Sequence, residues 1–233
     1  MRLDRYISNA SDYSRSQVKQ LVRQGLVELN GLPASNPGEI VSDNDQVCVD
    51  GIAIHTPGPR YLMLNKPAGV VSASKDSDHP TAIDLLDEPR PEQLQIAGRL
   101  DLDTTGLLLI TDDGQWNHRV TSPRSHCLKT YRVAVDRPLD EALIKKFADG
   151  LWLEGEKCRC LPAQLTIMDT HHALLVISEG KYHQVKRMFA AVGNLVTALH
   201  REQMGDIVLD PALAPGEYRA LTQEEIDSVG AHE

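Results

Sequence analysis

Residues 98–114 read G-R-L-D-L-D-T-T-G-L-L-L-I-T-D-D-G and join a polar loop to an apolar run. Asp101 and Asp103 lie one residue apart in the loop, and residues 107–110 form the apolar run. That run is long enough for a buried strand and too short for most helices. A polar loop that leads into a buried strand holds its side chains in fixed positions, as active sites require. The pattern therefore predicts a catalytic loop.

Other sites share part of this pattern. An EF-hand calcium loop would use Asp101, Asp103, Thr105 and Asp112, but it requires flanking helices and a terminal bidentate Glu. The D-x-D-x-T signature of aspartyl-phosphate phosphotransferases makes one Asp a nucleophile. It directly follows a buried strand, whereas residues 95–99 are only weakly strand-like. A surface turn with solvated carboxylates is the remaining alternative, so the rest of the chain has to decide.

Composition sets the broad class. The chain has 233 residues, which suggests one or two domains, and 41% of them are hydrophobic, enough for a sizeable core. A net charge of −9 does not by itself indicate a nucleic-acid-binding protein. The distribution of charge is more informative. Residues 1–25 carry five Lys and Arg against two Asp, whereas residues 26–59 have no Lys or Arg.

The cysteines and the apolar segments indicate a cytoplasmic protein. The four cysteines lack C-x-x-C spacing and a matching His pair, so we predict reduced thiols and no metal site. Cys158 and Cys160 are expected on an exposed strand. No stretch approaches the roughly 20 apolar residues of a membrane span, and the N-terminus lacks a signal-peptide apolar region.

Residues 1–58 read as a small helix–helix–hairpin module. Apolar spacing predicts a short amphipathic helix over residues 3–10. Ser14 and Gln17 form a capping box that opens a second helix, which Gly25 ends. Asn30-Gly31 and Asp50-Gly51 are hairpin turn sequences.

The second of these helices carries a row of cations. Arg15, Lys19 and Arg23, which we call the basic ridge, recur every four residues and so share one helix face. Such a face can hold RNA phosphates, because each contact releases condensed counterions. Residues 56–59 read T-P-G-P, which favours an extended linker. We therefore predict two domains, residues 1–58 and 59–233.

The pattern of residues 59–233 is typical of an α+β domain. Strands are predicted at residues 61–64, 107–110 and 128–135, and a hairpin near residues 163–178. Helices are predicted near residues 116–120, 142–147 and 185–192, and a last capping box spans residues 222–225. Strands and helices that do not alternate regularly favour a mixed, mainly antiparallel sheet with flanking helices.

Four motifs in this part resemble those of the RsuA-type pseudouridine synthases. They are L-N-K-P-x-G at 64–69, R-L-D-x-x-T-T-G-L-L at 99–108, K-T-Y at 129–131 and G-x-x-x-Q-V-K at 180–186. The N-terminal module resembles the S4 (αL-type) RNA-binding domain, with R-L-D at 2–4 and V-x-L-N-G at 27–31. The resemblance thus implies a bacterial synthase that acts on small-subunit (16S) ribosomal RNA.

The family resemblance also implies roles for individual residues. Asp101 would be the nucleophile, Tyr131 would pack against the flipped uracil, and Lys186 would pair with Asp101. Arg187 remains an alternative partner, and many relatives have Arg where this chain has Lys186. Asp103, Thr104 and Thr105 would fix the loop by local hydrogen bonds. The cations expected to contact RNA are Arg2, Arg15, Lys19, Arg23, Lys66, Arg99 and Arg187.

Pseudouridine formation involves no net oxidation or hydrolysis, so no cofactor or metal is expected. The target base must flip out of its stack before it can react. The expected partner is 16S rRNA, free or within an assembling small-subunit particle, and a monomer is expected. The alternative is a non-enzymatic S4-type RNA-binding or ribosome-assembly protein, which would not need Asp101, Tyr131 and Lys186 together.

Overall fold

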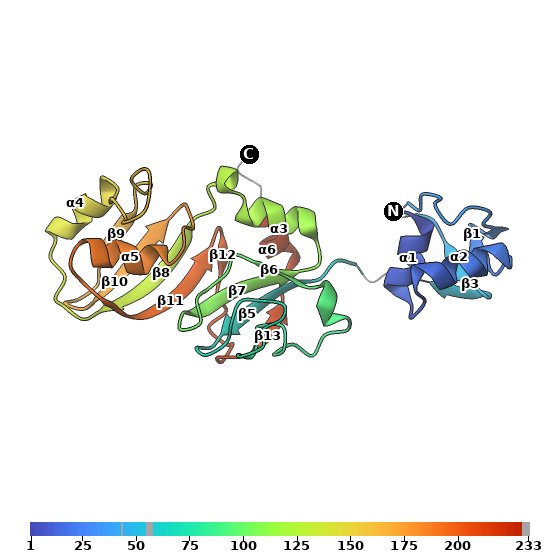
Figure 1. Ribbon diagram of the computed structural model, residues 1–233, viewed down its shortest axis with the longest axis horizontal. Coiled ribbons are helices and arrows are strands. Elements are labelled where there is room, and N and C mark those ends of the chain that lie inside the picture. Colours follow the sequence, from blue (N-terminus) through green and yellow to red (C-terminus); the bar gives the residue numbers. More distant parts are fainter. Residues whose placement is uncertain (43, 55–57, 230–233) are drawn as a thin grey trace. The chain divides into compact units, whose positions relative to one another are not determined.

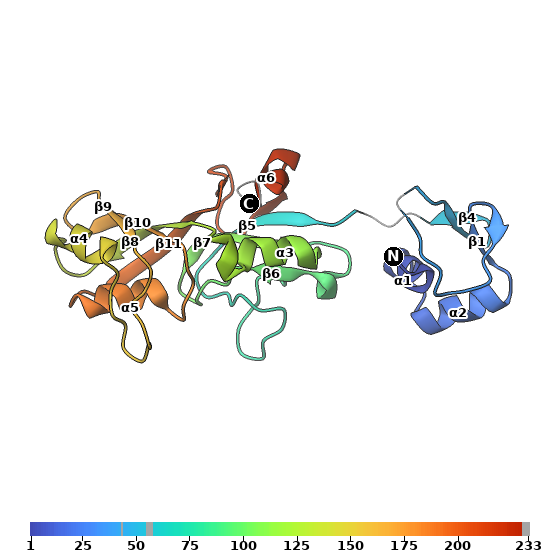
Figure 2. The same cartoon turned by 90° about the horizontal axis from the view of Figure 1, so that it is seen from above.

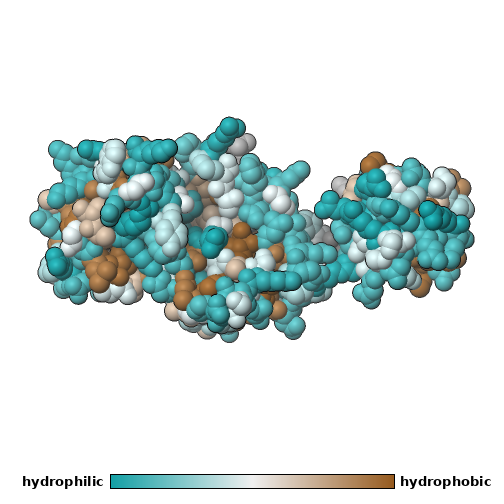
Figure 3. Space-filling model, viewed as in Figure 1, coloured by the Kyte–Doolittle hydropathy of each residue, from teal (hydrophilic) through white to brown (hydrophobic). Residues whose placement is uncertain are grey.

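The computed structural model describes residues 1–42, 44–54 and 58–229, which form two compact units, Met1–Gly58 and a larger one that begins at Pro59 (Figure 1). Hydrophilic residues cover most of the face of each unit in Figure 3. Among the described helices, none is long and apolar enough to cross a membrane. Thr56 and Pro57 of the predicted linker lie outside the described residues.

The small unit packs two helices on a four-stranded sheet of order β2-β1-β3-β4. Its elements are α1 (Leu3–Ala10), α2 (Arg15–Arg23), β1 (Val27–Leu29), β2 (Leu32–Pro33), β3 (Val47–Val49) and β4 (Ile52–Ile54). The predicted capping box at Ser14 is present. Asn30 and Gly31 both adopt positive φ (55° and 76°), as a tight hairpin turn requires. Apolar residues from both helices and the sheet form a separate core.

The larger unit is built on a nine-stranded sheet, with the order β13-β5-β7-β11-β8-β10-β9. Strands β12 and β6 pair with β11 and β7, outside this path. Only the β7–β11 pairing is parallel among the described pairs. The strands are β5 (Tyr61–Lys66), β6 (Gln95–Ala97), β7 (Thr105–Thr111), β8 (Lys129–Val135), β9 (Gln164–Ile167), β10 (His172–Ile177), β11 (Val196–Met204), β12 (Ile207–Val208) and β13 (Tyr218–Ala220).

Strand β7 is buried on both faces, which explains its unbroken apolar sequence. Leu108 and Ile110 belong to one core, and Leu107 and Leu109 belong to the core on the opposite face. Successive strand residues point to opposite faces, so a strand covered on both sides has no polar alternation. The buried strand predicted from residues 107–110 is therefore the centre of this domain.

Helices cover both faces of the sheet. Helix α3 (Gly114–Thr121) lies along β6, as Figure 2 shows, and Trp116 Nε1 donates a 3.1 Å hydrogen bond to the Ile226 carbonyl of α6 (Gln223–Ser228). Helices α4 (Ala142–Ala148) and α5 (Gln184–Ala191) belong to the other core, where Phe147 and Phe189 pack with ring centroids 5.0 Å apart. Short 3-10 turns occur at Pro91–Gln93 and Pro123–Ser125. The predicted α+β class is confirmed.

The predicted surroundings of the cysteines are wrong in part. Neither Cys158 nor Cys160 belongs to a strand. Cys160 is buried, and its Sγ accepts a 3.1 Å hydrogen bond from the Leu151 amide, so it packs inside a loop. Burial raises the pKa of the Cys160 thiol, which keeps it protonated.

Candidate active site

Residues 98–104, which we call the Asp101 loop, connect β6 to β7. The loop is fixed at Leu100, whose amide donates to Ser72 Oγ at 3.0 Å and whose carbonyl accepts from the same hydroxyl at 2.8 Å. Strands flank the loop on both sides, and an EF-hand requires helices there. The calcium-loop alternative is therefore excluded.

Lys186 of helix α5 bridges the two carboxylates of this loop. Its Nζ lies 3.5 Å from Oδ2 of Asp101 and 2.5 Å from Oδ1 of Asp103. The hydrogen bond from Lys186 lowers the pKa of Asp103. Asp101 is the better shielded of the two, since 29% of its side chain is exposed against 70% for Asp103. The protein thus holds Asp101 beside a cation at the edge of a cleft.

His183 also contacts Asp101, and the sequence analysis did not select it. Its Nε2 lies 3.4 Å from Oδ1 of Asp101. The residue precedes α5 in the left-handed region, with φ 47° and ψ 37°. Residues held in such sparsely populated conformations concentrate at functional sites. The only available signal in the sequence was its place in the motif that supplies Lys186.

A cleft of about 890 Å³ opens above the Asp101 loop. Its walls include Arg99, Asp101, Tyr131, His183 and Lys186. Tyr131 lies on β8 and is 7% exposed, so it is largely packed although it lines the cleft. The Asp101 loop, strand β8 and the start of helix α5 therefore bring residues from distant parts of the sequence to one cavity.

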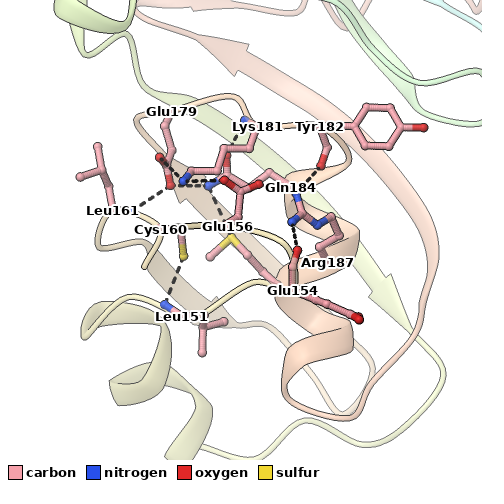
Figure 4. A network of polar contacts seen from close by, with 11 residues as sticks. Leu151, Glu154, Glu156, Cys160, Leu161, Glu179, Lys181, Tyr182, Gln184 and Arg187 are labelled. Carbon is pink, nitrogen blue, oxygen red and sulfur yellow. Dashed lines mark hydrogen bonds and ion pairs between the residues drawn. The ribbon is translucent and has the colours of Figure 1, made fainter. Parts of the chain in front are cut away.

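Arg187 is directed away from Asp101. Its guanidinium donates to Glu156 Oε1 at 2.9 Å and to the carbonyls of Glu154 (2.6 Å) and Tyr182 (3.0 Å). Figure 4 shows these contacts as part of a polar network between residues 154–161 and the segment before α5. Lys186, and not Arg187, is thus the cation next to Asp101. The Arg187 guanidinium is already hydrogen-bonded within the polar network.

The expectation that Lys66 contacts RNA is wrong. The side chain is fully buried, and its Nζ donates to the carbonyls of Thr104 (2.8 Å), Pro67 (2.9 Å) and Leu102 (3.4 Å). Burial lowers the pKa of Lys66 to about 8. The lysine thus holds the Asp101 loop through its carbonyls from inside the protein, and it cannot reach an RNA phosphate.

The local hydrogen bonds predicted in the loop are present only in part. Thr105 Oγ1 lies 2.8 Å from Nδ1 of His200, and the Thr104 amide donates to the Asp101 carbonyl at 3.1 Å. The Thr104 hydroxyl, however, is buried without a hydrogen-bond partner among the described residues. The Asp103 carboxylate accepts a hydrogen bond from Lys186, which lies outside the loop.

A buried arginine fixes the two ends of the Asp101 loop. Arg201 of β11 is 1% exposed, and it donates to the carbonyls of Gly98 (2.7 Å) and Leu107 (2.8 Å). Gly106 has a φ of 100°, and a Cβ there would collide with the Arg201 backbone. The glycine in the T-T-G motif is therefore required for the close approach of β7 to β11. Sequence patterns gave no reason to select Arg201.

The cations of the small unit differ in their surroundings. Arg15, Lys19 and Arg23 are exposed on α2, and none forms an ion pair with another described residue. Arg2 instead forms a two-point contact with the buried carboxylate of Asp4 at 2.9 and 3.1 Å. Arg99 of the larger unit is exposed at the cleft. The basic ridge is thus free to bind an anion, whereas the Arg2 charge is already paired.

Comparison with known proteins identifies the family to which this chain belongs. Residues 60–191 match the RNA pseudouridylate synthase family, and residues 1–47 match the S4 domain. The chain therefore belongs to the RNA pseudouridylate synthase family, whose members are isomerases acting on RNA. This confirms the family predicted from the four motifs and the predicted N-terminal S4 domain.

Two named relatives and one solved structure are similar to almost the whole chain. The chain is 53% identical over 232 residues to ribosomal small subunit pseudouridine synthase A of Yersinia pestis, covering 99% of both chains. The protein of the same name from Escherichia coli K12 is 50% identical over 230 residues, covering 98% of this chain and 100% of the relative. A crystal structure of a pseudouridylate synthase has 46% identity and a TM-score of 0.72, covering 98% and 99% of the two chains.

Proposed function

We propose that this enzyme isomerises one uridine of small-subunit ribosomal RNA to pseudouridine. The observation that carries the proposal is the position of the Asp101 carboxylate, which lies between Lys186 and His183 in a cleft that Tyr131 also lines. The relatives that match over the full chain bear the name ribosomal small subunit pseudouridine synthase A. Residues 1–58 would bind RNA through the basic ridge, and residues 59–233 would carry the reaction.

In this proposal Asp101 acts at the ribose of the flipped nucleotide. Its carboxylate either adds to C1′, as the nucleophile of a retaining glycosidase does, or removes a ribose proton. The N-glycosidic bond breaks, the uracil turns, and its C5 joins C1′. Lys186 would orient the carboxylate and offset its charge, because its ammonium lies 3.5 Å from Oδ2 of Asp101.

Tyr131 and Arg99 would handle the base and the strand. The ring of Tyr131 would stack on the flipped uracil, and base–aromatic stacking contributes roughly 1–3 kcal/mol toward the cost of flipping. Its hydroxyl would take part in removing the C5 proton. Arg99 would occupy the vacated place in the RNA stack or hold a flanking phosphate. No metal or cofactor enters these steps.

In this proposal the enzyme would act as a monomer in the cytoplasm. Its substrate would be either free ribosomal RNA or an assembling small-subunit particle. A non-enzymatic RNA-binding protein is the rival class, and it would not require an aspartate held by a lysine inside a cleft.

A pseudouridine map of small-subunit rRNA tests the proposal. Carbodiimide labelling and primer extension would compare cells with and without the gene, and deletion strains complemented by variants. One modified position should vanish on deletion, return with wild type and stay absent with Asp101→Asn. The matched control is Asp103→Asn, which changes the neighbouring carboxylate of the same loop and should restore the position. An unchanged map on deletion would reject the proposal.

A further inference from the structure

Tyr182 is an exposed aromatic side chain at the edge of the cleft. It is 77% exposed, the most of any large hydrophobic residue described, and it lines the cleft with His183. The two rings are stacked, with centroids 3.8 Å apart and planes inclined by 21°. The described part of the chain offers the Tyr182 hydroxyl no hydrogen-bond partner. One face of the ring is thus supported, and the other is open to solvent.

The segment that carries Tyr182 is held firmly although its ring is exposed. Arg187 donates to the Tyr182 carbonyl at 3.0 Å, and the Lys181 amide donates to Gln184 Oε1 at 2.8 Å. Gln184 Nε2 in turn donates to Glu179 Oε1 at 2.7 Å. Figure 4 shows the Tyr182 ring pointing away from this network. The polar network therefore positions the ring without covering it.

The stack is connected to the reacting carboxylate. His183 packs against Tyr182 on its ring face, and its Nε2 lies 3.4 Å from Oδ1 of Asp101. A flat group bound on the open face of Tyr182 would therefore be separated from His183, which contacts Asp101, by the Tyr182 ring alone. This is the position expected for the neighbour of a nucleotide that reacts at Asp101.

We infer that the open face of Tyr182 stacks on an RNA base adjacent to the target uridine. This inference rests on the proposed function. When the target base leaves its stack, its neighbour loses a stacking partner, and a rigid aromatic face can replace it because every base offers a π-face. Covering the exposed face of an aromatic ring also buries apolar surface, which is favourable. Tyr182 is thus a substrate-positioning residue that recognises a base of the flanking RNA.

Steady-state kinetics of the full chain test this inference. Wild type, Tyr182→Phe, Tyr182→Leu and Trp152→Leu are assayed by tritium release from a small-subunit rRNA transcript labelled at uridine C5. Trp152 is the matched control, because it is 59% exposed but does not line the cleft. We expect Tyr182→Leu to raise KM about tenfold, or ~1.4 kcal/mol, with kcat within about twofold. Tyr182→Phe and Trp152→Leu should match wild type.

The same enzymes are then assayed on RNA that carries an abasic nucleotide on one or the other side of the mapped uridine. With the stacking base removed, wild type should have the raised KM of Tyr182→Leu, and the substitution should add nothing. If Tyr182→Leu equals wild type on intact RNA, or if its effect persists on both abasic RNAs, the inference is overturned. Absence of tritium release by wild type, both from the transcript and from the same RNA within an assembling small-subunit particle, is a different result, because it rejects the proposed function and this inference with it.

Discussion

The Nζ atom of Lys186 lies 3.5 Å from Oδ2 of Asp101 and so joins helix α5 to the loop before β7. Both side chains are more than a quarter exposed, so the pair adds little to stability. The pair matters for position, because the lysine orients the Asp101 carboxylate at the cleft. The same ammonium also lies 2.5 Å from Oδ1 of Asp103, so one cation offsets the charge of both carboxylates of the loop.

Replacing Lys186 by Met should lower kcat about tenfold to a hundredfold. Lys186→Arg should retain more of the wild-type kcat, because it keeps the positive charge although not the geometry of the ammonium. The expected loss reflects a carboxylate that is no longer fixed by a cation. Tritium release measures both variants, and circular dichroism checks their folding. A Met variant with the kcat of wild type would remove Lys186 from the mechanism.

The Lys186–Asp103 contact should also be visible in acid. The folded pKa of Asp103 lies below its unfolded value of 3.8 because Lys186 donates to it. The stability from this contact is therefore present above pH ~4 and is lost as pH falls through the folded pKa. In Lys186→Met, NMR titration should show the Asp103 pKa higher than in wild type. An identical pKa in both proteins would contradict the role of this contact.

Lys66 should make stability rise with pH in the alkaline range. Burial lowers its folded pKa from 10.5 to about 8, so between these values the unfolded chain binds the extra proton and the free energy of unfolding increases. The increase is at most roughly 3 kcal/mol. Urea unfolding at pH about 8 and about 10 should show this rise in wild type and in the control Lys145→Met. Lys66→Met should show a smaller rise, because burial also lowers the pKa of Lys129, and an equal rise in all three proteins would contradict the lowered pKa of Lys66.

Tyr131→Phe keeps the ring that packs in the core and removes only the hydroxyl. If the hydroxyl takes part in removing the C5 proton, kcat should fall by about a hundredfold while KM stays within about twofold. Measuring both constants on the same transcript separates the two roles. An unchanged kcat would confine Tyr131 to packing against the base.

Charge reversal on the basic ridge should weaken RNA binding without changing the fold. The double variant Arg15→Glu, Lys19→Glu should bind rRNA less tightly at low salt and reduce the slope of log K against log salt by about 1 to 2. Filter binding over a salt series measures this. The control Lys145→Glu, Lys146→Glu makes the same charge change on α4 and should leave the slope near that of wild type. Equal slopes for both double variants would assign the phosphate contacts elsewhere.

Much of the fold could be predicted because local rules fix it. Capping boxes at Ser14 and Thr222 and the Asn30-Gly31 turn act over a few residues, and each is present. The apolar run of β7 can be read as a buried strand from its length and its lack of polar residues. The Asp101 loop was found from the order of four motifs, which is a property of the sequence alone.

Other parts of the site depend on contacts that no local pattern encodes. The sequence favours Lys186 and leaves Arg187 as an alternative, and only the rotation of α5 against the sheet directs one to Asp101 and the other to Glu156. Lys66 was expected to contact RNA, yet packing of β5 against the Asp101 loop buries it. His183 and Tyr182 acquire their positions from the polar network before α5.

The sequence by itself determined the class of fold and the family, and it selected the aspartate that we propose to react, because periodicity, capping and motif order can be read along the chain without its tertiary structure. The tertiary structure decided which charges meet, which lysine is buried and which aromatic ring stays exposed at the cleft. These depend on the packing of strands and helices that are distant in sequence, where a rotation of one residue along a helix exchanges one partner for another.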